Sequence, residues 1–275
     1  MTLGVGLIGC GAIGTVLACA IDDGQAGNAR LVMIYDLTAK KCKILCEKLV
    51  CKPKIAKSFE ELVTCEDVGL IIEAASQEAV RTYASRALRA GKDLMIMSVG
   101  ALVDSELVRE VRRYAIEGGK RVYIPSGAIA GLDGVKAAVI GKVDSVTLRT
   151  RKPPEGLKDA PYVKEKKMRL QKLENPTLIY EGPASKACKL FPANVNVAAS
   201  LALAGIGVER TKVQIIADPF IRRNIHEIKV KGEFGELKIN IRNIPMTDNP
   251  KTSQLAALSA IATLKKISEP LTVGT

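Results

Sequence analysis

The stretch Met1-Thr2-Leu3-Gly4-Val5-Gly6-Leu7-Ile8-Gly9-Cys10-Gly11-Ala12-Ile13-Gly14 decides the fold. The apolar run from Leu3 to Ile8 has the length and composition of a buried parallel strand. The run ends in a G-x-G-x-x-G pattern, and apolar residues at helical spacing follow from Ile13 to Ile21. The stretch therefore predicts a strand, a tight glycine turn and a helix, which is the first unit of a doubly wound sheet.

Such a unit binds a dinucleotide when an acidic residue follows at the right distance. A second apolar strand, residues 30–35, ends in Asp36, 22 residues after Gly14. There a carboxylate can accept hydrogen bonds from the ribose hydroxyls of NAD. Lys40 and Lys41 follow closely and could tolerate a 2′-phosphate, so NADP stays open beside NAD. The residues expected to contact the cofactor here are Gly9, Gly11, Ala12, Ile13, Gly14 and Asp36.

Strands and helices, among them a helix expected over residues 77–89, continue to alternate as far as residue 124, which predicts a parallel Rossmann sheet. Ligands of such sheets lie at the carboxyl ends of the strands. Four more cofactor contacts are expected at the ends of the strands 68–75 and 93–97: Ala75, Ser76, Ser98 and Val99.

The pattern changes at Pro125, after which several strand-like runs, one of them over residues 211–217, surround helices expected over residues 135–140 and 193–203. We predict a dinucleotide-binding domain over residues 1–124 and an α+β domain with a mainly antiparallel sheet over residues 125–245. The second domain is expected to carry the substrate and to form the dimer. A final helical segment, residues 246–275, is expected to pack back on the first domain.

Composition restricts the alternatives. The 275 residues are 47% apolar and 25% charged, and no apolar run could span a membrane. The N-terminus lacks the features of a signal peptide, which favours a cytoplasmic protein. Seven scattered cysteines match no zinc pattern, so no metal site is predicted. The net charge of +12 comes without a nucleic-acid-binding motif, and no nucleic-acid partner is expected.

The chain contains one histidine, His226. With the period of a strand, Asn224, His226, Ile228 and Val230 share the more apolar face. A lone histidine on such a face is commonly structural. A dehydrogenase, however, needs a group that takes a proton near neutral pH, and histidine is the usual one.

The sequence resembles the L-aspartate dehydrogenase family. The resemblance extends over nearly the whole chain, and its specific motifs lie in the second half. The matching segments are residues 9–14, 73–76, 98–102, 125–133, 150–154, 190–198 and 224–227. The resemblance implies that His226 is catalytic, that Ala130 and Asn196 contact the cofactor, and that the product is iminoaspartate, a precursor of NAD. Iminoaspartate can also hydrolyse to oxaloacetate and ammonia.

Two substrate carboxylates would need cationic or amide partners. The candidates are Thr150, Lys152 and Asn224, with Arg151 disfavoured because it should face the other side of its strand. Two other functions remain open. One is a homoserine, amino-acid or semialdehyde dehydrogenase of the same architecture, and the other is a non-catalytic NAD(H)-binding sensor.

Overall fold

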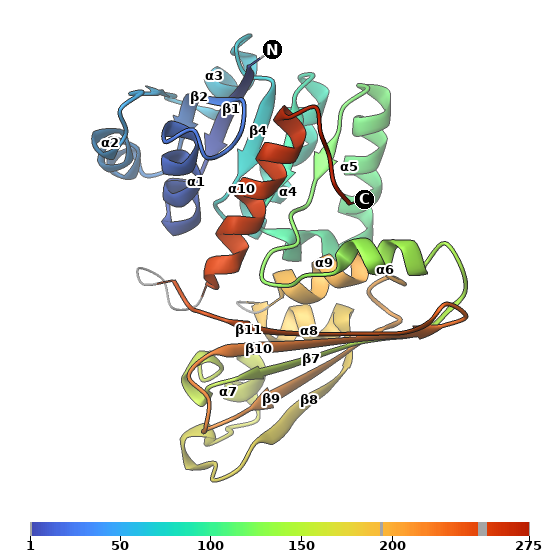
Figure 1. Cartoon of the computed structure of the whole chain (residues 1–275). Coiled ribbons are helices and arrows are strands. Elements are labelled where there is room, and N and C mark those ends of the chain that lie inside the picture. The colour runs from blue at the N-terminus through green and yellow to red at the C-terminus, as the bar shows by residue number, and fades with distance from the viewer. Residues whose placement is uncertain (1, 193–194, 247–251, 275) are drawn as a thin grey trace. The chain divides into compact units, whose positions relative to one another are not determined.

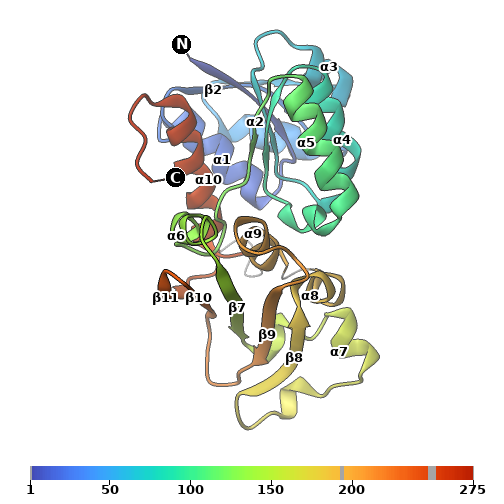
Figure 2. The same cartoon turned by 90° about the vertical axis from the view of Figure 1, so that its right-hand side faces the viewer.

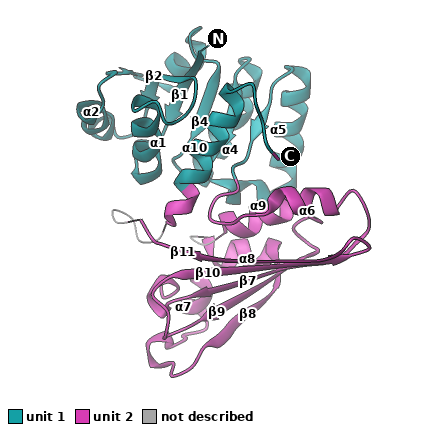
Figure 3. Cartoon of the chain, in the orientation of Figure 1, with its two compact units in different colours: residues 1–125, 257–273 teal, residues 126–256, 274–275 magenta. Residues whose placement is uncertain are grey.

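The computed structural model describes residues 2–192, 195–246 and 252–274 (Figure 1). The chain divides into two compact units (Figure 3). Unit 1 contains residues 1–125 and 257–273, and unit 2 contains residues 126–256 with the last two residues of the chain.

Unit 1 is built on a six-stranded parallel sheet with the order β3-β2-β1-β4-β5-β6. The strands are β1 (Leu3–Ile8), β2 (Ala29–Tyr35), β3 (Lys54–Ile55), β4 (Leu70–Glu73), β5 (Asp93–Ile96) and β6 (Val122–Tyr123). The central strands are buried along almost their whole length, as their apolar runs predict for a sheet covered on both faces. The predicted Rossmann sheet is confirmed.

Helices connect these strands. They are α1 (Ala12–Asp22), α2 (Ala39–Lys48), α3 (Phe59–Thr64), α4 (Gln77–Arg89) and α5 (Ser105–Glu117), with a 3₁₀ turn η1 (Val99–Val103). Side-chain caps define several starts. The Ser76 hydroxyl accepts a hydrogen bond from the Ala79 amide at 3.1 Å, and the Asp104 carboxylate accepts from the Glu106 amide at 3.0 Å. Helix α1 begins at Gly11 without a side-chain cap.

Unit 2 contains a five-stranded sheet with the order β11-β10-β7-β9-β8. Its strands are β7 (Val143–Lys152), β8 (Thr177–Pro183), β9 (Thr211–Ala217), β10 (Asn224–Gly232) and β11 (Gly235–Asn243). Three of the four pairings are antiparallel, and β7 pairs with β9 in parallel. The sheet is therefore mixed, with the antiparallel character that the sequence predicts.

Helices α6 (Leu132–Ala138), α8 (Ala184–Leu190) and α9 (Asn196–Ala204) gather on one side of this sheet (Figures 1 and 2). Small residues on α8 and α9, such as Ala187 and Ala199, are buried and allow close packing. The helix predicted over residues 193–203 begins on residues outside the described part, and α9 begins at Asn196. Helix α6 starts earlier than the predicted 135–140, because Gly131 adopts φ +74° and turns the chain there.

The segment from residue 153 to 173 has structure that the sequence patterns did not indicate. It contains α7 (Pro161–Glu165) and two 3₁₀ turns, η2 (Pro154–Gly156) and η3 (Leu170–Lys172). These elements are too short to show a helical period.

The last helix, α10 (Gln254–Ser268), belongs mainly to unit 1. Ala260 and Leu264 are fully buried in the same core cluster as Leu17 of α1. The Ser268 hydroxyl accepts a hydrogen bond from the Asn28 amide at 2.9 Å. The C-terminal segment therefore completes the core of the unit in which the chain begins.

Candidate functional site

The glycines after β1 serve three different purposes. Gly9 has φ +98°, and a Cβ there would lie 2.6 Å from the Ala74 carbonyl oxygen. A Cβ on Gly14 would overlap the Gly9 carbonyl, so Gly14 allows α1 to approach the strand. At Gly11, by contrast, a Cβ would have no atom of a described residue within 4 Å. Packing within the described chain therefore does not require glycine at position 11, and the space beside it fits the cradle for a pyrophosphate.

A cleft of about 340 Å³ opens beside this loop, within unit 1. Of the predicted cofactor residues it is lined by Gly9, Gly11, Asp36, Ala75 and Ser76. Tyr35, Leu37, Thr38, Lys41, Glu78, Ala79, Thr82 and Tyr83 also line it, and the sequence had suggested only Lys41 among them. Leu37 is 85% exposed, so it offers an apolar surface at the cleft.

Asp36 joins the glycine loop to the end of β2. One carboxylate oxygen accepts a hydrogen bond from the Cys10 amide at 2.9 Å, and the other accepts from the Thr38 amide at 2.8 Å. A carboxylate has about four acceptor positions. Asp36 can therefore hold the loop and still accept hydrogen bonds from a ribose.

Glu73, the last residue of β4, organises the neighbouring loops. Its carboxylate is 1% exposed and accepts hydrogen bonds from the amides of Ala75, Ser76 and Ser98 at 2.8–3.0 Å, and from the Ser98 hydroxyl at 2.9 Å. Burial raises the pKa of Glu73, and these hydrogen bonds oppose the rise. The sequence reasoning did not assign this role to Glu73. The feature that could have indicated it is an acidic residue at the end of an otherwise apolar strand.

The other predicted residues of unit 1 lie next to the cleft rather than on its lining. Ala12 and Ile13 begin α1, where free backbone N–H groups favour phosphate. Ser98 immediately precedes η1. Val99 is 3% exposed, so its side chain belongs to the core and only its backbone is available to a ligand.

In unit 2, His226 and Thr150 face each other across the β10–β7 pairing. The His226 Nδ1 and the Thr150 Oγ1 are 3.0 Å apart. Both residues are buried, with exposures of 3% and 6%. The predicted apolar face of β10 is correct, because His226, Ile228 and Val230 are all buried on it.

Lys152 projects from β7 on the same face as Thr150 and is 6% exposed. Burial lowers the pKa of Lys152 to about 8. Burial, together with the charge of Lys152, lowers the pKa of His226 to about 3. This shift moves the ring away from the titration near neutral pH that the sequence led us to expect. At neutral pH this face carries a neutral imidazole and a cationic ammonium group.

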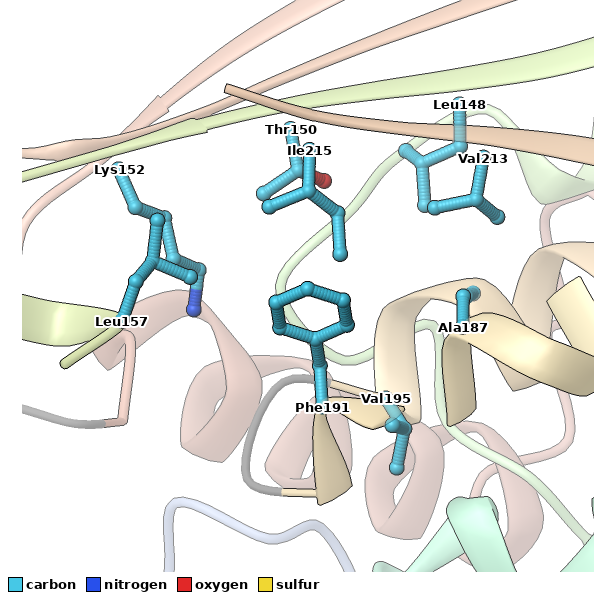
Figure 4. Close-up of a pocket in the computed structure, with 10 residues that line it drawn as sticks. Leu148, Thr150, Lys152, Leu157, Ala187, Phe191, Val195, Val213 and Ile215 are labelled. Atoms are coloured by element: carbon cyan, nitrogen blue, oxygen red, sulfur yellow. The ribbon is translucent and has the colours of Figure 1, made fainter. Parts of the chain in front are cut away.

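A narrow cavity of about 10 Å³ lies beside Thr150 and Lys152, with room for about one water molecule (Figure 4). Its other walls are apolar, and Figure 4 shows the Phe191 ring below Thr150 and the Lys152 side chain beside Leu157. A buried titratable side chain with a shifted pKa, such as Lys152 beside this cavity, is a candidate for a functional residue.

Arg151 points to the opposite face of β7, as predicted. Its Nε donates a hydrogen bond to Asp218 at 2.9 Å, and its Nη2 forms an ion pair with the same carboxylate. Because Asp218 is fully buried, this pair fixes the adjoining ends of β7 and β9.

The remaining predicted residues of unit 2 lie at the ends of its elements. Ala130 and Asn196 are exposed near the starts of α6 and α9, which pack together. Asn224 is half-buried at the start of β10 and pairs with Asn243 of β11. The buried Asn243 side-chain amide donates to the Ala128 carbonyl at 2.8 Å. Asn243 thus anchors the loop that carries Ala130, a role that sequence reasoning missed.

Within the described ranges, no group of three or more metal-ligating side chains is close enough to hold an ion. All seven cysteines are free, and burial raises the pKa of Cys10 and Cys42, whose sulfur atoms are 3.6 Å apart. None of the helices in the described part of the chain is long and apolar enough to cross a membrane.

The fold and the cleft define a two-unit dinucleotide-binding protein of the dehydrogenase type. Comparison with known proteins agrees in both halves. Residues 9–125 match the NAD-binding domain family of homoserine dehydrogenase, and residues 133–267 match the C-terminal domain family of aspartate dehydrogenase. The predicted NAD or NADP cofactor is confirmed at this level, and the second half separates this protein from homoserine dehydrogenase.

L-aspartate dehydrogenases from Methanosarcina barkeri and Methanosarcina acetivorans are 51% and 52% identical to this chain, over 99% of it and 100% of theirs. The crystal structure of aspartate dehydrogenase from Thermotoga maritima superimposes with a TM-score of 0.79 at 29% identity, over 100% of both chains. The chain belongs to the L-aspartate dehydrogenase family. The resemblance seen in the sequence is confirmed.

Proposed function

We propose that this protein catalyses the reversible NAD(P)-dependent oxidation of L-aspartate to iminoaspartate, which hydrolyses to oxaloacetate and ammonia. Beyond family membership, one observation carries the proposal. A neutral imidazole and a buried ammonium group share one covered face of the unit 2 sheet. A dicarboxylate with a reacting amine needs a cation and a proton acceptor of this kind.

The cofactor, when bound, accepts the hydride from the aspartate Cα. Gly11 and the free amides at the start of α1 would receive its pyrophosphate, and Asp36 its adenosine ribose. Ala12, Ile13, Gly14, Ala75, Ser76, Ser98, Val99, Ala130 and Asn196 complete the proposed cofactor residues. Lys41 lines the cleft with Asp36 and offers a cation to the 2′-phosphate of NADP, so the cofactor is NAD or NADP.

His226 would take a proton from the substrate amine or from the attacking water, and return it in the reductive direction. Lys152 would bind one substrate carboxylate through a charge-assisted hydrogen bond, with Asn224 as a further partner. A bound dicarboxylate offsets the charge of Lys152. It therefore raises the pKa of His226 from its value of about 3 and makes the ring a better base during turnover.

The direct test is to mix the purified protein with L-aspartate and NAD or NADP and to follow absorbance of the reduced nicotinamide. Turnover with aspartate, and much less with homoserine or glutamate, is the expected result. Cofactor binding without turnover would favour the sensor, and preference for homoserine would favour the related dehydrogenase.

We further propose that the protein is a homodimer joined through the unit 2 sheet, and that its iminoaspartate enters NAD biosynthesis. The face opposite the helices carries exposed Leu178, which pairs with Ile216 on β9. Light scattering on the eluting protein gives the molar mass, and a monomer would contradict the dimer. Growth of an NAD-auxotrophic strain that lacks its own iminoaspartate source tests the metabolic role.

A further inference from the structure

The contact between Thr150 and His226 has a consequence for the protonation of the ring. A neutral imidazole carries its proton on either Nδ1 or Nε2, and the hydrogen bond made by one nitrogen decides the state of the other. Of the described residues, Thr150 is the one whose side chain is within hydrogen-bond distance of this ring, at Nδ1. The remaining nitrogen, Nε2, is the atom that must take a proton if His226 acts in the reaction.

We propose that Thr150 is a positioning residue, whose hydroxyl oxygen accepts the Nδ1 proton of His226 and so leaves the Nε2 lone pair available as the base. This assignment rests on the proposed role of His226. It also replaces the expectation that Thr150 binds a substrate carboxylate.

The surroundings of Thr150 favour this direction of the hydrogen bond. Thr150 lines the small cavity, so its own hydroxyl proton can be donated to a water molecule there. With the bond reversed, Nε2 would carry a proton for which the described residues provide no acceptor. Unpaired buried N–H groups are rarer in proteins than unpaired acceptors.

The two strands also hold this pair rigidly. Thr150 and His226 are directly opposite in the β7–β10 register, and a further residue pair flanks them on each side. A threonine has one rotatable side-chain bond before its hydroxyl, and its Cβ branching restricts that bond. The hydroxyl therefore orients the ring as well as its proton.

The decisive measurement uses the fact that the chain has one histidine. In protein labelled with ¹⁵N-histidine, the two ring nitrogens give the tautomer directly from their chemical shifts at neutral pH. We expect the Nδ1–H form in the wild type, although free imidazoles prefer Nε2–H. A wild-type ring in the Nε2–H form would overturn the proposal, whether or not any variant folds.

Thr150→Val keeps the shape of the side chain and removes the hydroxyl. We expect the ring to lose its preference for Nδ1–H and kcat to fall about tenfold or more, which is less than the loss expected on removing the base itself. Thr150→Ser should restore both. The dissociation constant for the nicotinamide cofactor should stay unchanged in both variants.

Thr211→Val is the matched control. Thr211 is a buried threonine on β9, on the same covered face, and its hydroxyl donates to the Gly207 carbonyl at 2.8 Å. We expect the loss of either threonine hydroxyl to lower Tm. In Thr211→Val, however, the His226 tautomer and kcat should stay unaltered. If the two valine variants changed the tautomer and kcat equally, Thr150 would have only a structural role and the proposal would be wrong. Absence of aspartate turnover in the wild type would instead contradict the proposed function, and the tautomer would still be readable.

Discussion

The two candidate sites of this protein are built in opposite ways. The candidate cofactor cleft of unit 1 opens beside a glycine loop, and this loop leads directly into the N-terminus of α1, which has no side-chain cap. The site in unit 2 is made of side chains from separate strands, and its two reactive groups are buried. A backbone cradle recognises a shape common to many dinucleotide enzymes, whereas buried titratable side chains select one chemistry. This difference explains why the match of the second half identifies the family.

The largest effect that would separate the two sites is expected when His226 is replaced. Because general acid–base catalysis contributes about 10²- to 10⁴-fold, His226→Asn should lower kcat by about that factor. Cofactor affinity, measured by titration, should barely change, since the proposed pyrophosphate and ribose contacts belong to unit 1. Near wild-type turnover at saturating aspartate would remove the catalytic assignment.

His226→Asn should also change how the Tm depends on pH. The pKa of His226 lies below its unfolded value, so its stabilising effect is present above about pH 6.5 and is lost as pH falls towards 3. His226→Asn should therefore show a weaker loss of Tm than the wild type over that range.

The backbone cradle is tested at Gly11. Gly11→Val should weaken cofactor binding by at least about 100-fold, roughly 3 kcal/mol, because the new side chain would fill the proposed pyrophosphate site. Tm should change little, since a Cβ there meets no described atom within 4 Å. Gly14→Ala is the matched contrast, because its Cβ would overlap the Gly9 carbonyl and should lower Tm. Unaltered affinity in Gly11→Val would place the phosphates elsewhere.

Replacement of Lys152 should weaken the binding of aspartate. Lys152→Met removes a charge-assisted hydrogen bond worth roughly 1.5–3 kcal/mol, so the KM for aspartate should rise about 10- to 100-fold while that for NAD stays constant. Lys229→Met, on the exposed face of β10, should leave both constants unchanged.

The same replacement should change how stability depends on pH. The pKa of Lys152 lies below its unfolded value, so the wild type should gain stability relative to Lys152→Met as pH rises from about 8 to about 10.5. Urea unfolding of both proteins across this range measures the difference. Parallel pH profiles of the two proteins would contradict the lowered pKa of Lys152.

The smallest expected effect concerns cofactor choice. Asp36→Ala removes ribose hydrogen bonds and the repulsion of a 2′-phosphate, and should shift the ratio of kcat/KM for NADP and NAD about tenfold towards NADP, about 1.4 kcal/mol. Adding Lys41→Met should cancel most of the gain, because Lys41 lines the same cleft. A constant ratio would mean that Asp36 acts only on the Cys10 and Thr38 amides.

Much of the fold followed from local patterns. The helix predicted over residues 77–89 and the strand over 211–217 have the predicted bounds, because each has a clear period and a clear end signal. The parallel pairing of β7 with β9 could not be predicted, since period two is the same in parallel and antiparallel strands. Short turns such as α7 carry too few residues to show a period.

For the candidate cofactor cleft, the sequence by itself indicated Gly9, Gly11 and Asp36, because one βαβ unit brings these residues together. It also determined which face of β10 is buried, and so the environment of His226. Only the tertiary structure decided that Thr150, 76 residues away, contacts the ring, and that burial together with the charge of Lys152 lowers the pKa of the ring. The same holds for the four hydrogen bonds of Glu73 and for the Asn243–Ala128 contact. The physical reason is that strand register and burial are set by packing among distant segments, and local sequence carries no record of which residues become neighbours.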